Sequence, residues 1–241
     1  MTFPDKRRAL ITGASSGIGK ETALAFAKAG IDVALVSRSL SKLTEIAEQA
    51  RKAGVDARAY AIDLAILDQV KDQISSLIGD FGFVDVLVNN AGMGYTGMLL
   101  ETPLVDWQQI IDLNLTSAFQ CIQAVLPSMR NRRRGLIINI ASNAGQQAFP
   151  GWGAYSVSKA GMIALSRSLA VEERSNGVRV TTLCPGAVNT PLWDTATVQA
   201  DFDRTSMLTP EAVAQSILQM VQLSEQAVVE ALTLMPSAGA L

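Results

Sequence analysis

Tyr155 and Lys159 are the side chains whose types and spacing most directly suggest chemistry, because they lie four residues apart. On a helix, residues i and i+4 share a face, so the phenol and the ammonium would be neighbours. A nearby cation favours the phenolate and lowers the pKa of the phenol. We therefore expect Tyr155 to act as a general acid or base near neutral pH. A tyrosine that only packs over a lysine stem has the same spacing, so the pair needs support from the rest of the chain.

Histidine is absent from the 241 residues. This excludes Ser-His-Asp and Cys-His catalysis and removes the usual ligand of a catalytic zinc, so we expect no metal. Proton transfer is left to Tyr, Lys, Asp, Glu or water, which agrees with the hypothesis for Tyr155 and Lys159. Cys121 and Cys184 lie in apolar segments and are expected to be buried thiols.

A segment near the N-terminus has the pattern of a nucleotide site. Arg8 to Thr12 predicts a buried strand, which runs into the sequence GASSGIG at residues 13–19 and then into a helical pattern. A strand, a glycine turn and a helix N-terminus together cradle the pyrophosphate of a dinucleotide. The spacing GxxxGxG differs from GxGxxG and from a P-loop. A turn that only connects a strand and a helix is the alternative.

The elements that must position these residues alternate along the chain. Apolar, β-branched runs alternate with longer amphipathic ones, which is typical of βαβ units and a parallel sheet. The expected strands are Ala9–Thr12, Asp32–Ser37, Ala57–Asp63, Val84–Asn89, Gly135–Ile140, Val178–Leu183 and Val228–Leu234. The expected helices are Gly17–Ala29, Leu40–Ala53, Ile66–Gly79, Pro103–Asn131, Ala154–Asn176 and Pro210–Leu223.

No linker or repeat divides the chain, so we expect a single domain over residues 1–241. The fold class is α/β, a Rossmann-type doubly wound parallel sheet with helices on both faces. The cofactor would lie over the carboxyl ends of the strands. Thr102 and Pro103 predict an N-cap and a first helical residue.

Five motifs stand in the order and at the spacings of one known family. They are Thr12-Gly13-xxx-Gly17-x-Gly19, Asn89-Asn90-Ala91-Gly92, Ser142, Tyr155-xxx-Lys159 and Pro185-Gly186. Together they resemble the short-chain dehydrogenase/reductase family over nearly the whole chain. The resemblance implies a seven-stranded sheet, a nicotinamide cofactor and oxidoreductase activity on CH–OH and C=O groups.

The resemblance also implies roles for individual residues. Ser142 would hydrogen-bond the substrate oxygen, and Lys159 would hold the nicotinamide ribose. Asn114, in a distorted helix, would hold a water that links Lys159 to solvent. The implied catalytic set is thus Asn114, Ser142, Tyr155 and Lys159. The residues implied to contact the cofactor are Gly13, Ser15, Ser16, Gly17, Ile18, Gly19, Ser37, Arg38, Asp63, Leu64, Asn90, Ala91, Gly92, Tyr155, Lys159, Pro185, Gly186, Val188 and Thr190.

The end of the second expected strand bears on the type of cofactor. Ser37 occupies a position that is acidic in NAD-preferring relatives, and Arg38 follows it. A guanidinium suits a bidentate contact with the 2′-phosphate of NADP, so NADP (NADPH) is the expected cofactor. Ser16 stands where many NADP-dependent relatives carry a second basic residue. An Arg38 that is only a solvated loop residue is the alternative.

The expected substrate pocket is largely apolar. Its residues are Met93, Ala144, Gln147, Phe149, Trp152, Gly186 and Trp193. They include no cation for a carboxylate or phosphate, so we expect a neutral carbonyl or secondary alcohol, although the apolar side chains could equally be ordinary core. The segment from Pro191 to Thr209 is short for a lid, which predicts an open site.

Three interpretations of the function compete: two kinds of enzyme within this family and one protein without catalytic activity. The C-terminal segment 228–236 departs from the glycine-rich end of 3-oxoacyl-acyl-carrier-protein reductases and favours a broad-specificity, NADP-dependent carbonyl reductase or alcohol dehydrogenase. The carrier-protein reductase is second. Arg130, Arg132, Arg133 and Arg134 would suit an acidic carrier, but they also suit a helix C-terminus. A non-catalytic NADP-binding sensor or scaffold is the third.

Composition bounds the partners and the location. A net charge of −2 and an isolated arginine cluster argue against nucleic-acid binding. No apolar stretch approaches the roughly 18 residues of a membrane span. The N-terminus lacks the apolar region of a signal peptide, so we expect a cytoplasmic protein without a membrane partner. The helices expected over residues 103–131 and 154–176 carry more apolar surface than one sheet covers, and the resemblance implies a homodimer or homotetramer.

Overall fold

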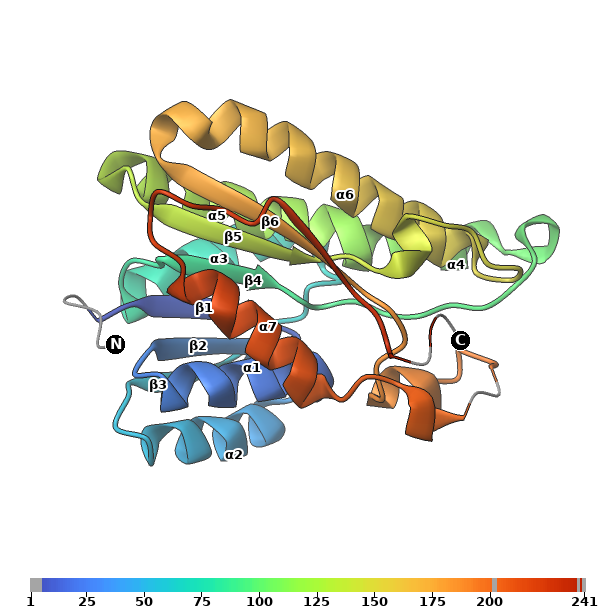
Figure 1. Cartoon of the computed structure of the whole chain (residues 1–241), viewed down its shortest axis with the longest axis horizontal. Coiled ribbons are helices and arrows are strands. Elements are labelled where there is room, and N and C mark those ends of the chain that lie inside the picture. The colour runs from blue at the N-terminus through green and yellow to red at the C-terminus, as the bar shows by residue number, and fades with distance from the viewer. Residues whose placement is uncertain (1–5, 201–202, 238, 240–241) are drawn as a thin grey trace.

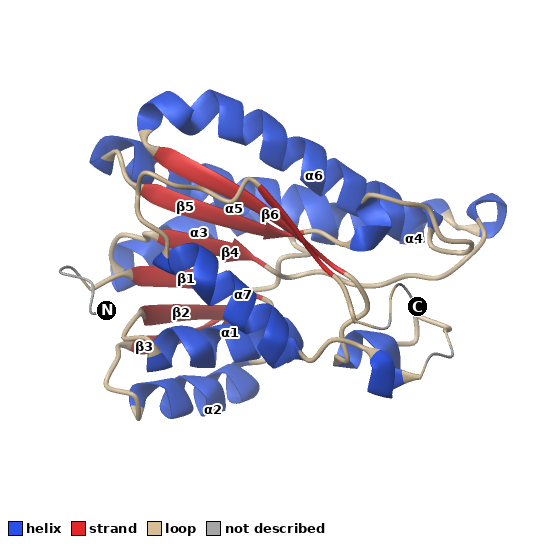
Figure 2. Ribbon diagram, viewed as in Figure 1, coloured by secondary structure: helices blue, strands red, loops and turns tan. Residues whose placement is uncertain are grey.

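A parallel β-sheet organises the computed structural model, which describes residues 6–200, 203–237 and 239 (Figures 1 and 2). Its seven strands lie side by side in the order β3-β2-β1-β4-β5-β6-β7. Their bounds are β1 (Arg8–Thr12), β2 (Asp32–Ser37), β3 (Ala57–Ala61), β4 (Val86–Asn89), β5 (Gly135–Ile140), β6 (Val178–Pro185) and β7 (Ala231–Leu234). The chain reverses its direction of travel across the sheet between β1 and β4, where open α/β sheets bind ligands.

Helices cover both faces of this sheet (Figure 1). They are α1 (Gly17–Lys28), α2 (Leu40–Arg51), α3 (Leu67–Phe81), α4 (Leu104–Ile111), α5 (Ser117–Arg132), α6 (Gly153–Glu173) and α7 (Pro210–Gln222). Helices α1, α2 and α7 share a core with one face, and α3, α5 and α6 with the other. The strands are therefore buried on both sides, which explains their continuous apolar sequences.

No helix among the described residues is long and apolar enough to cross a membrane.

The amphipathic pattern specifies these helices locally. In α3, Val70, Ile74, Leu77 and Phe81 are buried and fall on one stripe of the helix. The helix ends at Gly82, whose φ of +96° is a conformation that side chains rarely adopt. The seven-stranded doubly wound sheet predicted from the sequence is confirmed.

Five strand ends differ from the prediction, because the ladders between strands decide them. β1 begins one residue earlier, at Arg8, and β4 begins two residues later, at Val86. β3 stops at Ala61, which pairs with the last residue of β2, Ser37. β7 begins only at Ala231, which pairs with Thr182. β6 continues to Pro185, since that residue still pairs with β7.

The helix expected from Pro103 begins one residue later, at Leu104, and contains a π-helical turn. Pro103 itself is the N-cap, and the Thr102 hydroxyl donates to the Met98 carbonyl oxygen (2.9 Å) instead of capping the helix. A π-helical turn, Asp112–Thr116, separates α4 from α5. Periodicity alone does not reveal such a turn, because α-helical patterns continue on both sides of it.

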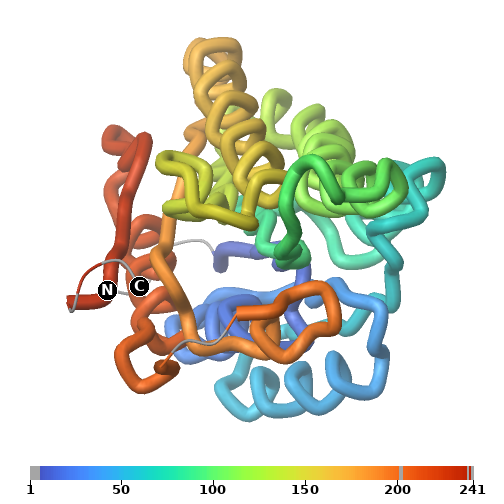
Figure 3. The backbone as a smooth tube through the Cα atoms, turned by 90° about the vertical axis from the view of Figure 1, so that its right-hand side faces the viewer, coloured from blue at the N-terminus to red at the C-terminus, as the bar shows by residue number. Residues whose placement is uncertain are grey.

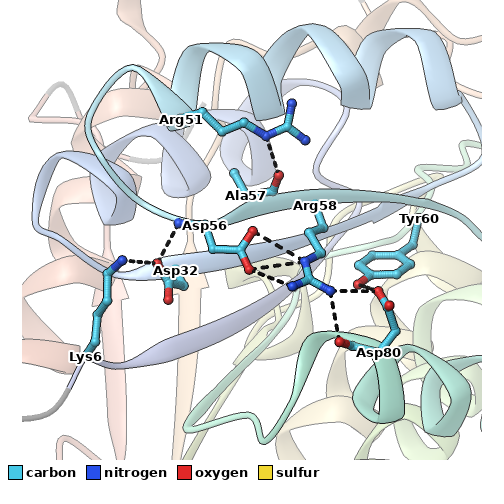
Figure 4. Close-up of polar contacts among 8 residues, drawn as sticks. All are labelled: Lys6, Asp32, Arg51, Asp56, Ala57, Arg58, Tyr60 and Asp80. Atoms are coloured by element: carbon cyan, nitrogen blue, oxygen red, sulfur yellow. Dashed lines mark hydrogen bonds and ion pairs between the residues drawn. The ribbon is translucent and has the colours of Figure 1, made fainter.

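Polar side chains secure the edge strand β3 (Figure 4). The Arg58 guanidinium contacts Asp56 (3.0 Å) and Asp80 (3.1 Å), and the Tyr60 hydroxyl donates to Asp80 (2.6 Å). Buried Asp32 accepts from the Asp56 backbone N–H (2.7 Å). These contacts tie the edge strand to β2 and to the end of α3, and charged edges also resist pairing with other chains.

Candidate active site

The loops that follow the strands leave the sheet at one edge and enclose a cavity of about 760 Å³. Figure 3 faces this edge, and the segments after β4, β5 and β6 (green, yellow and orange) point toward the viewer. The volume falls within the roughly 300–1,000 Å³ of small-molecule sites. The predicted residues that line the cavity are Gly13, Ser15, Ser16, Gly17, Ile18, Ser37, Arg38, Asp63, Leu64, Asn90, Ala91, Gly92, Met93, Ser142, Ala144, Phe149, Trp152, Tyr155, Lys159, Pro185, Gly186, Val188, Thr190 and Trp193.

Three predicted residues do not line the cavity. Gln147 is exposed elsewhere on the loop after β5. Gly19 is buried behind the glycine turn, where an added Cβ would lie 2.4 Å from the Gly13 carbonyl oxygen. Asn114 is fully buried beneath the cavity wall. Gly19 and Asn114 can therefore act only through the residues they position.

The glycine turn has the conformation that its sequence predicts. Gly13 and Gly17 have φ values of +64° and +52°, which favour glycine. A Cβ on Gly13 would approach the Ala91 Cα to 2.9 Å, and one on Gly17 would approach Thr190 Cγ2 to 3.0 Å. The turn thus leaves an open cradle at the start of α1, where Ser16 makes no side-chain cap.

Hydrogen bonds lock this turn to the loop after β4. The Thr12 hydroxyl oxygen accepts from the backbone N–H groups of Asn90 and Ala91 (3.0 Å each). In return, the Asn90 side-chain amide donates to the carbonyl oxygens of Thr12 (3.0 Å) and Gly13 (3.2 Å). The glycine turn after β1 and the loop after β4, which form two walls of the cavity, are therefore held together as one unit.

Asn114 lies in the π-helical turn, which is the local distortion that the family resemblance implies. Its Oδ1 accepts from the Met93 backbone N–H (2.8 Å), and its Nδ2 donates to the Met93 carbonyl oxygen (2.9 Å) and to Ser158 Oγ (3.0 Å). The Ser158 hydroxyl donates to the Tyr155 carbonyl oxygen (2.7 Å). The side chain thus ties the loop after β4 to the first turns of α6.

Ser142, Tyr155 and Lys159 meet at the start of α6. The Lys159 Nζ donates to the Ile140 carbonyl oxygen (2.9 Å) and lies 5.7 Å from the Tyr155 ring centroid. Ser142 Oγ accepts from the Ala144 backbone N–H (3.1 Å) and forms a hydrogen bond with the Tyr155 hydroxyl. A carbonyl oxygen placed here would meet two hydroxyl donors.

Burial is the largest influence on the pKa values of Tyr155 and Lys159, and its effect on Tyr155 differs from what the sequence predicts. Burial raises the pKa of Tyr155 above its usual value, and only the hydrogen bond from Ser142 acts in the other direction. The predicted lowering of that pKa by Lys159 is wrong for the protein on its own. Burial also lowers the pKa of Lys159 to about 8. Tyr155 is therefore protonated at neutral pH, whereas Lys159 loses its charge not far above it.

Lys42 is a cavity residue that the sequence analysis missed. It lies in the first turn of α2 and lines the same end of the cavity as Arg38. Both side chains are exposed, and neither forms an ion pair within the described part of the chain. Lys42 could have been predicted from its position in the first turn of the helix that follows β2, because in a parallel sheet the helices that follow the strands begin at the edge where the cavity lies.

Aromatic rings line the other end of the cavity. The Trp152 ring centroid lies 5.4 Å from that of Tyr155 and 5.7 Å from that of Trp193, with an interplanar angle of 69° in both pairs. These are edge-to-face contacts. The Trp193 indole N–H donates to the Val188 carbonyl oxygen (2.8 Å), which fixes the orientation of that ring.

The segment 191–199, part of the stretch expected to be short for a lid, is tied to the loop after β4. The Thr96 backbone N–H donates to the Thr197 carbonyl oxygen (2.9 Å), and the Thr197 hydroxyl donates to the Gly94 carbonyl oxygen (2.8 Å). The Gln199 N–H donates to the Thr96 hydroxyl oxygen (2.7 Å). This segment, which we call the strap, forms a wall of the cavity through Leu192, Thr195 and Thr197.

Comparisons with known proteins agree with this geometry. The model of the short chain dehydrogenase family matches residues 7–201. The 3-oxoacyl-acyl-carrier-protein reductase FabG of Staphylococcus epidermidis is 39% identical over 183 residues, which are 76% of this chain and 75% of the relative. An alcohol dehydrogenase from the archaeon Thermococcus sibiricus, complexed with 5-hydroxy-NADP, matches with a TM-score of 0.90 and 29% identity over 98% of this chain and 99% of its own. A metagenomic short-chain oxidoreductase in complex with NADP matches with a TM-score of 0.83 and 30% identity over 96% and 97%.

Proposed function

Because the chain belongs to the short-chain dehydrogenase/reductase family of oxidoreductases that act on CH–OH and C=O groups, we propose that it transfers hydride between NADPH and a neutral carbonyl or secondary alcohol. Tyr155 would be the general acid and base. The observation that carries this proposal is the layout of one cavity, which holds Ser142, Tyr155 and Lys159 at one end and the cations Arg38 and Lys42 at the other.

The residues around the glycine turn fit a dinucleotide. Positive φ values at Gly13 and Gly17 keep the turn open, and an added Cβ at either glycine would crowd the cradle. The start of α1 offers backbone N–H groups and a positive dipole to a pyrophosphate. Thr190 borders the same cradle, and Asp63 and Leu64 line the cavity beyond it, where an adenosine would lie.

The charges at the far end favour NADP over NAD. Arg38 and Lys42 lie beside Ser37 at the end of β2, where a carboxylate would instead bind the ribose hydroxyls. A 2′-phosphate would meet a guanidinium and an ammonium that no described carboxylate neutralises. Lys42 supplies the second cation that Ser16 does not provide.

The reaction then follows from the positions of the side chains. NADPH, when bound, supplies the hydride that reduces the carbonyl carbon. Ser142 and Tyr155 hydrogen-bond the carbonyl oxygen and stabilise the negative charge that develops there. Tyr155, protonated at neutral pH, gives its proton to that oxygen. In the oxidation of an alcohol the same hydroxyl group, as phenolate, would take the proton back.

Lys159 and Asn114 support this proton transfer. With the cofactor bound, a charged Lys159 would stabilise the phenolate that Tyr155 becomes after giving up its proton, an effect that is absent in the protein on its own. Asn114 acts as a positioning residue, because its side chain holds Met93 and Ser158 in place. The carbonyl groups freed by the π-helical turn around Asn114 would accept from a water that returns a proton to Lys159.

The cavity lining supports a neutral substrate. Its charged members are Arg38, Lys42, Asp63 and Lys159. The first three lie at the proposed adenosine end, and the Lys159 ammonium is buried and bonded to a backbone carbonyl oxygen. No cation at the substrate end therefore awaits a carboxylate or a phosphate within the described part of the chain.

A carrier-protein reductase is the second candidate, because relatives of the chain at 39% identity carry the name 3-oxoacyl-acyl-carrier-protein reductase. The arginines at the end of α5 give it little support. Arg130 pairs with buried Glu173, Arg132 pairs with Asp85 (3.0 Å), and Arg134 pairs with Glu225 (3.0 Å). They hold the fold together and offer few free charges to an acidic carrier.

Exposed apolar side chains on α4, α5 and α6 support a homo-oligomer. They include Leu104 (78% exposed), Val105 (71%) and Val171 (74%). Apolar faces of this kind are typical of interfaces. We propose that two copies pack these helices together in a dimer, within a tetramer if a second interface exists.

NADPH affinity is expected to fall as the pH rises through about 8, because burial lowers the pKa of Lys159 to about 8. Below this pH the ammonium attracts the negatively charged cofactor and offers the N–H donors that the Ile140 carbonyl oxygen leaves unused; above it the charge is lost. Fluorescence titration of NADPH from pH 7 to 9.5 measures the effect. Lys159→Met should bind more weakly than the wild type at pH 7 and show no change over this range. A wild-type affinity that stays constant would contradict the assignment.

The proposed function is tested by following NADPH oxidation with a panel of carbonyl compounds, repeated with NADH. α-Diketones, simple ketones and medium-chain aldehydes should be reduced, with NADPH preferred. Selective turnover of acetoacetyl thioesters would support the carrier-protein reductase instead. Tight NADPH binding without any turnover would contradict both candidates.

A further inference from the structure

Three aromatic rings follow one another across the substrate end of the cavity. Trp152 stands between Tyr155 and Trp193, with centroid distances of 5.4 and 5.7 Å and the same interplanar angle of 69°. Consecutive rings therefore present edges to faces, the arrangement that aromatic rings prefer over a face-to-face stack. The proton-donating Tyr155 is itself the first ring of this series.

The backbone around these rings is fixed. The Trp152 N–H donates to the Phe149 carbonyl oxygen (3.1 Å), and its own carbonyl oxygen accepts from Ser156 (2.8 Å). The Gly97 N–H donates to the Gly151 carbonyl oxygen (2.7 Å) beside it. The indole N–H of Trp193 bonds to a backbone carbonyl oxygen, and the strap that carries this ring is tied to the loop after β4. A substrate would therefore meet rings that are already in place.

Two threonine hydroxyls at this end are engaged by the backbone, and the side chains of Gln109 and Asn143 also line the cavity. The Thr195 hydroxyl donates to the Leu192 carbonyl oxygen (2.9 Å), and the Thr197 hydroxyl donates to the Gly94 carbonyl oxygen (2.8 Å). The hydroxyls left to donate to a substrate are those of Ser142 and Tyr155, and both converge on one point. The carbonyl oxygen of a substrate is thus anchored, and the substituent on its carbonyl carbon meets aromatic rings.

We propose that the site selects carbonyl compounds whose carbonyl carbon bears an aromatic ring, with Trp152 and Trp193 as the specificity-determining residues. This inference rests on the proposed function. An aryl group beside the carbonyl extends the edge-to-face series, whereas a saturated ring of the same size gains only burial. Each aromatic pair adds a preference of about 2- to 12-fold beyond burial.

The test compares acetophenone with cyclohexyl methyl ketone, which differ mainly in the aromaticity of one ring. We expect the ratio of their kcat/KM values to fall by about 2- to 12-fold in Trp152→Leu and in Trp193→Leu, mostly through KM. Comparing ratios between variants removes the intrinsic difference in reactivity of the two ketones. Trp152→Phe keeps a ring and should retain most of the preference.

Trp107→Leu is the matched control, because Trp107 lies on α4 and does not line the cavity. Its ratio should equal that of the wild type. A second measurement does not depend on turnover: the protein with NADP should bind benzamide more tightly than cyclohexanecarboxamide, and Trp193→Leu should lose this difference.

Ratios that remain at the wild-type value in both leucine variants would overturn the inference. The proposed function would stand in that case, provided that the wild type reduces aliphatic ketones with NADPH. Full activity of a variant without the Tyr155 hydroxyl would instead overturn the proposed function. The two failures are therefore distinguishable.

Discussion

Replacing Tyr155 by phenylalanine is expected to lower kcat for carbonyl reduction by about 100- to 10,000-fold, the usual contribution of general acid catalysis. The substitution keeps the ring that packs against Trp152 and removes only the hydroxyl. NADPH affinity should remain within a few-fold, since the phosphate cradle and the Arg38 end are untouched. Steady-state rates and a fluorescence titration of NADPH on the same preparation measure both quantities.

Two variants make this result specific. Tyr95→Phe removes another hydroxyl, one that donates to Asp106 (3.2 Å) and does not line the cavity, so kcat should stay within about twofold. Ser142→Ala removes one of the two donors to the carbonyl oxygen and should cost less than Tyr155→Phe, about 10- to 100-fold. A Tyr155→Phe protein with wild-type kcat would show that the proton comes from elsewhere.

Arg38→Asp is expected to weaken NADPH binding by about 100-fold or more while NADH binding changes only a few-fold. The substitution removes a charge-assisted contact to the 2′-phosphate and places a carboxylate in its position, which repels the phosphate and can accept the ribose hydroxyls of NAD. Dissociation constants for both cofactors, measured at one ionic strength, give the change in preference directly.

The control places the same charge change at the far end of α2, the helix that follows Arg38. Lys52 is the exposed C-cap of α2, so Lys52→Asp should change both affinities equally and slightly. Lys42→Ala should weaken NADPH more than NADH, but less than Arg38→Asp does. Equal losses for the two cofactors in Arg38→Asp would contradict the NADP assignment.

Much of the fold could be predicted from the sequence, because the requirements of individual strands and turns determine it. Strands buried on both faces need continuous apolar runs, so β2 and β5 begin and end at the predicted residues. The glycine turn needs positive φ, and the sequence places glycine at residues 13 and 17 for that reason. Where a strand ends against its neighbour depends on the other chain segment, and β3 and β7 were accordingly predicted too long.

The parts of the site that were not predicted depend on contacts between distant residues. The clamp that Asn114 forms on Met93 and Ser158 joins three separate elements, and no local pattern encodes it. The strap is tied by Thr96 and Thr197, which are about a hundred residues apart in the sequence. The pKa of Tyr155 depends on how deeply the fold buries it, which the spacing to Lys159 does not reveal.

The pairing of Arg130 with Glu173 has a consequence for how this part of the sequence can evolve. Glu173 is completely buried, so losing Arg130 leaves its carboxylate without a compensating charge inside the protein, whereas the half-exposed Arg130 guanidinium reaches water. Single substitutions of Arg130 should therefore be purged by selection, whereas a simultaneous exchange of Arg130 and Glu173 for two apolar residues would be tolerated. Arg133 forms no ion pair with any described residue, and its guanidinium donates to the Ser175 carbonyl oxygen (2.9 Å). Among homologues, positions 130 and 173 should therefore covary, and position 133 should drift independently of both.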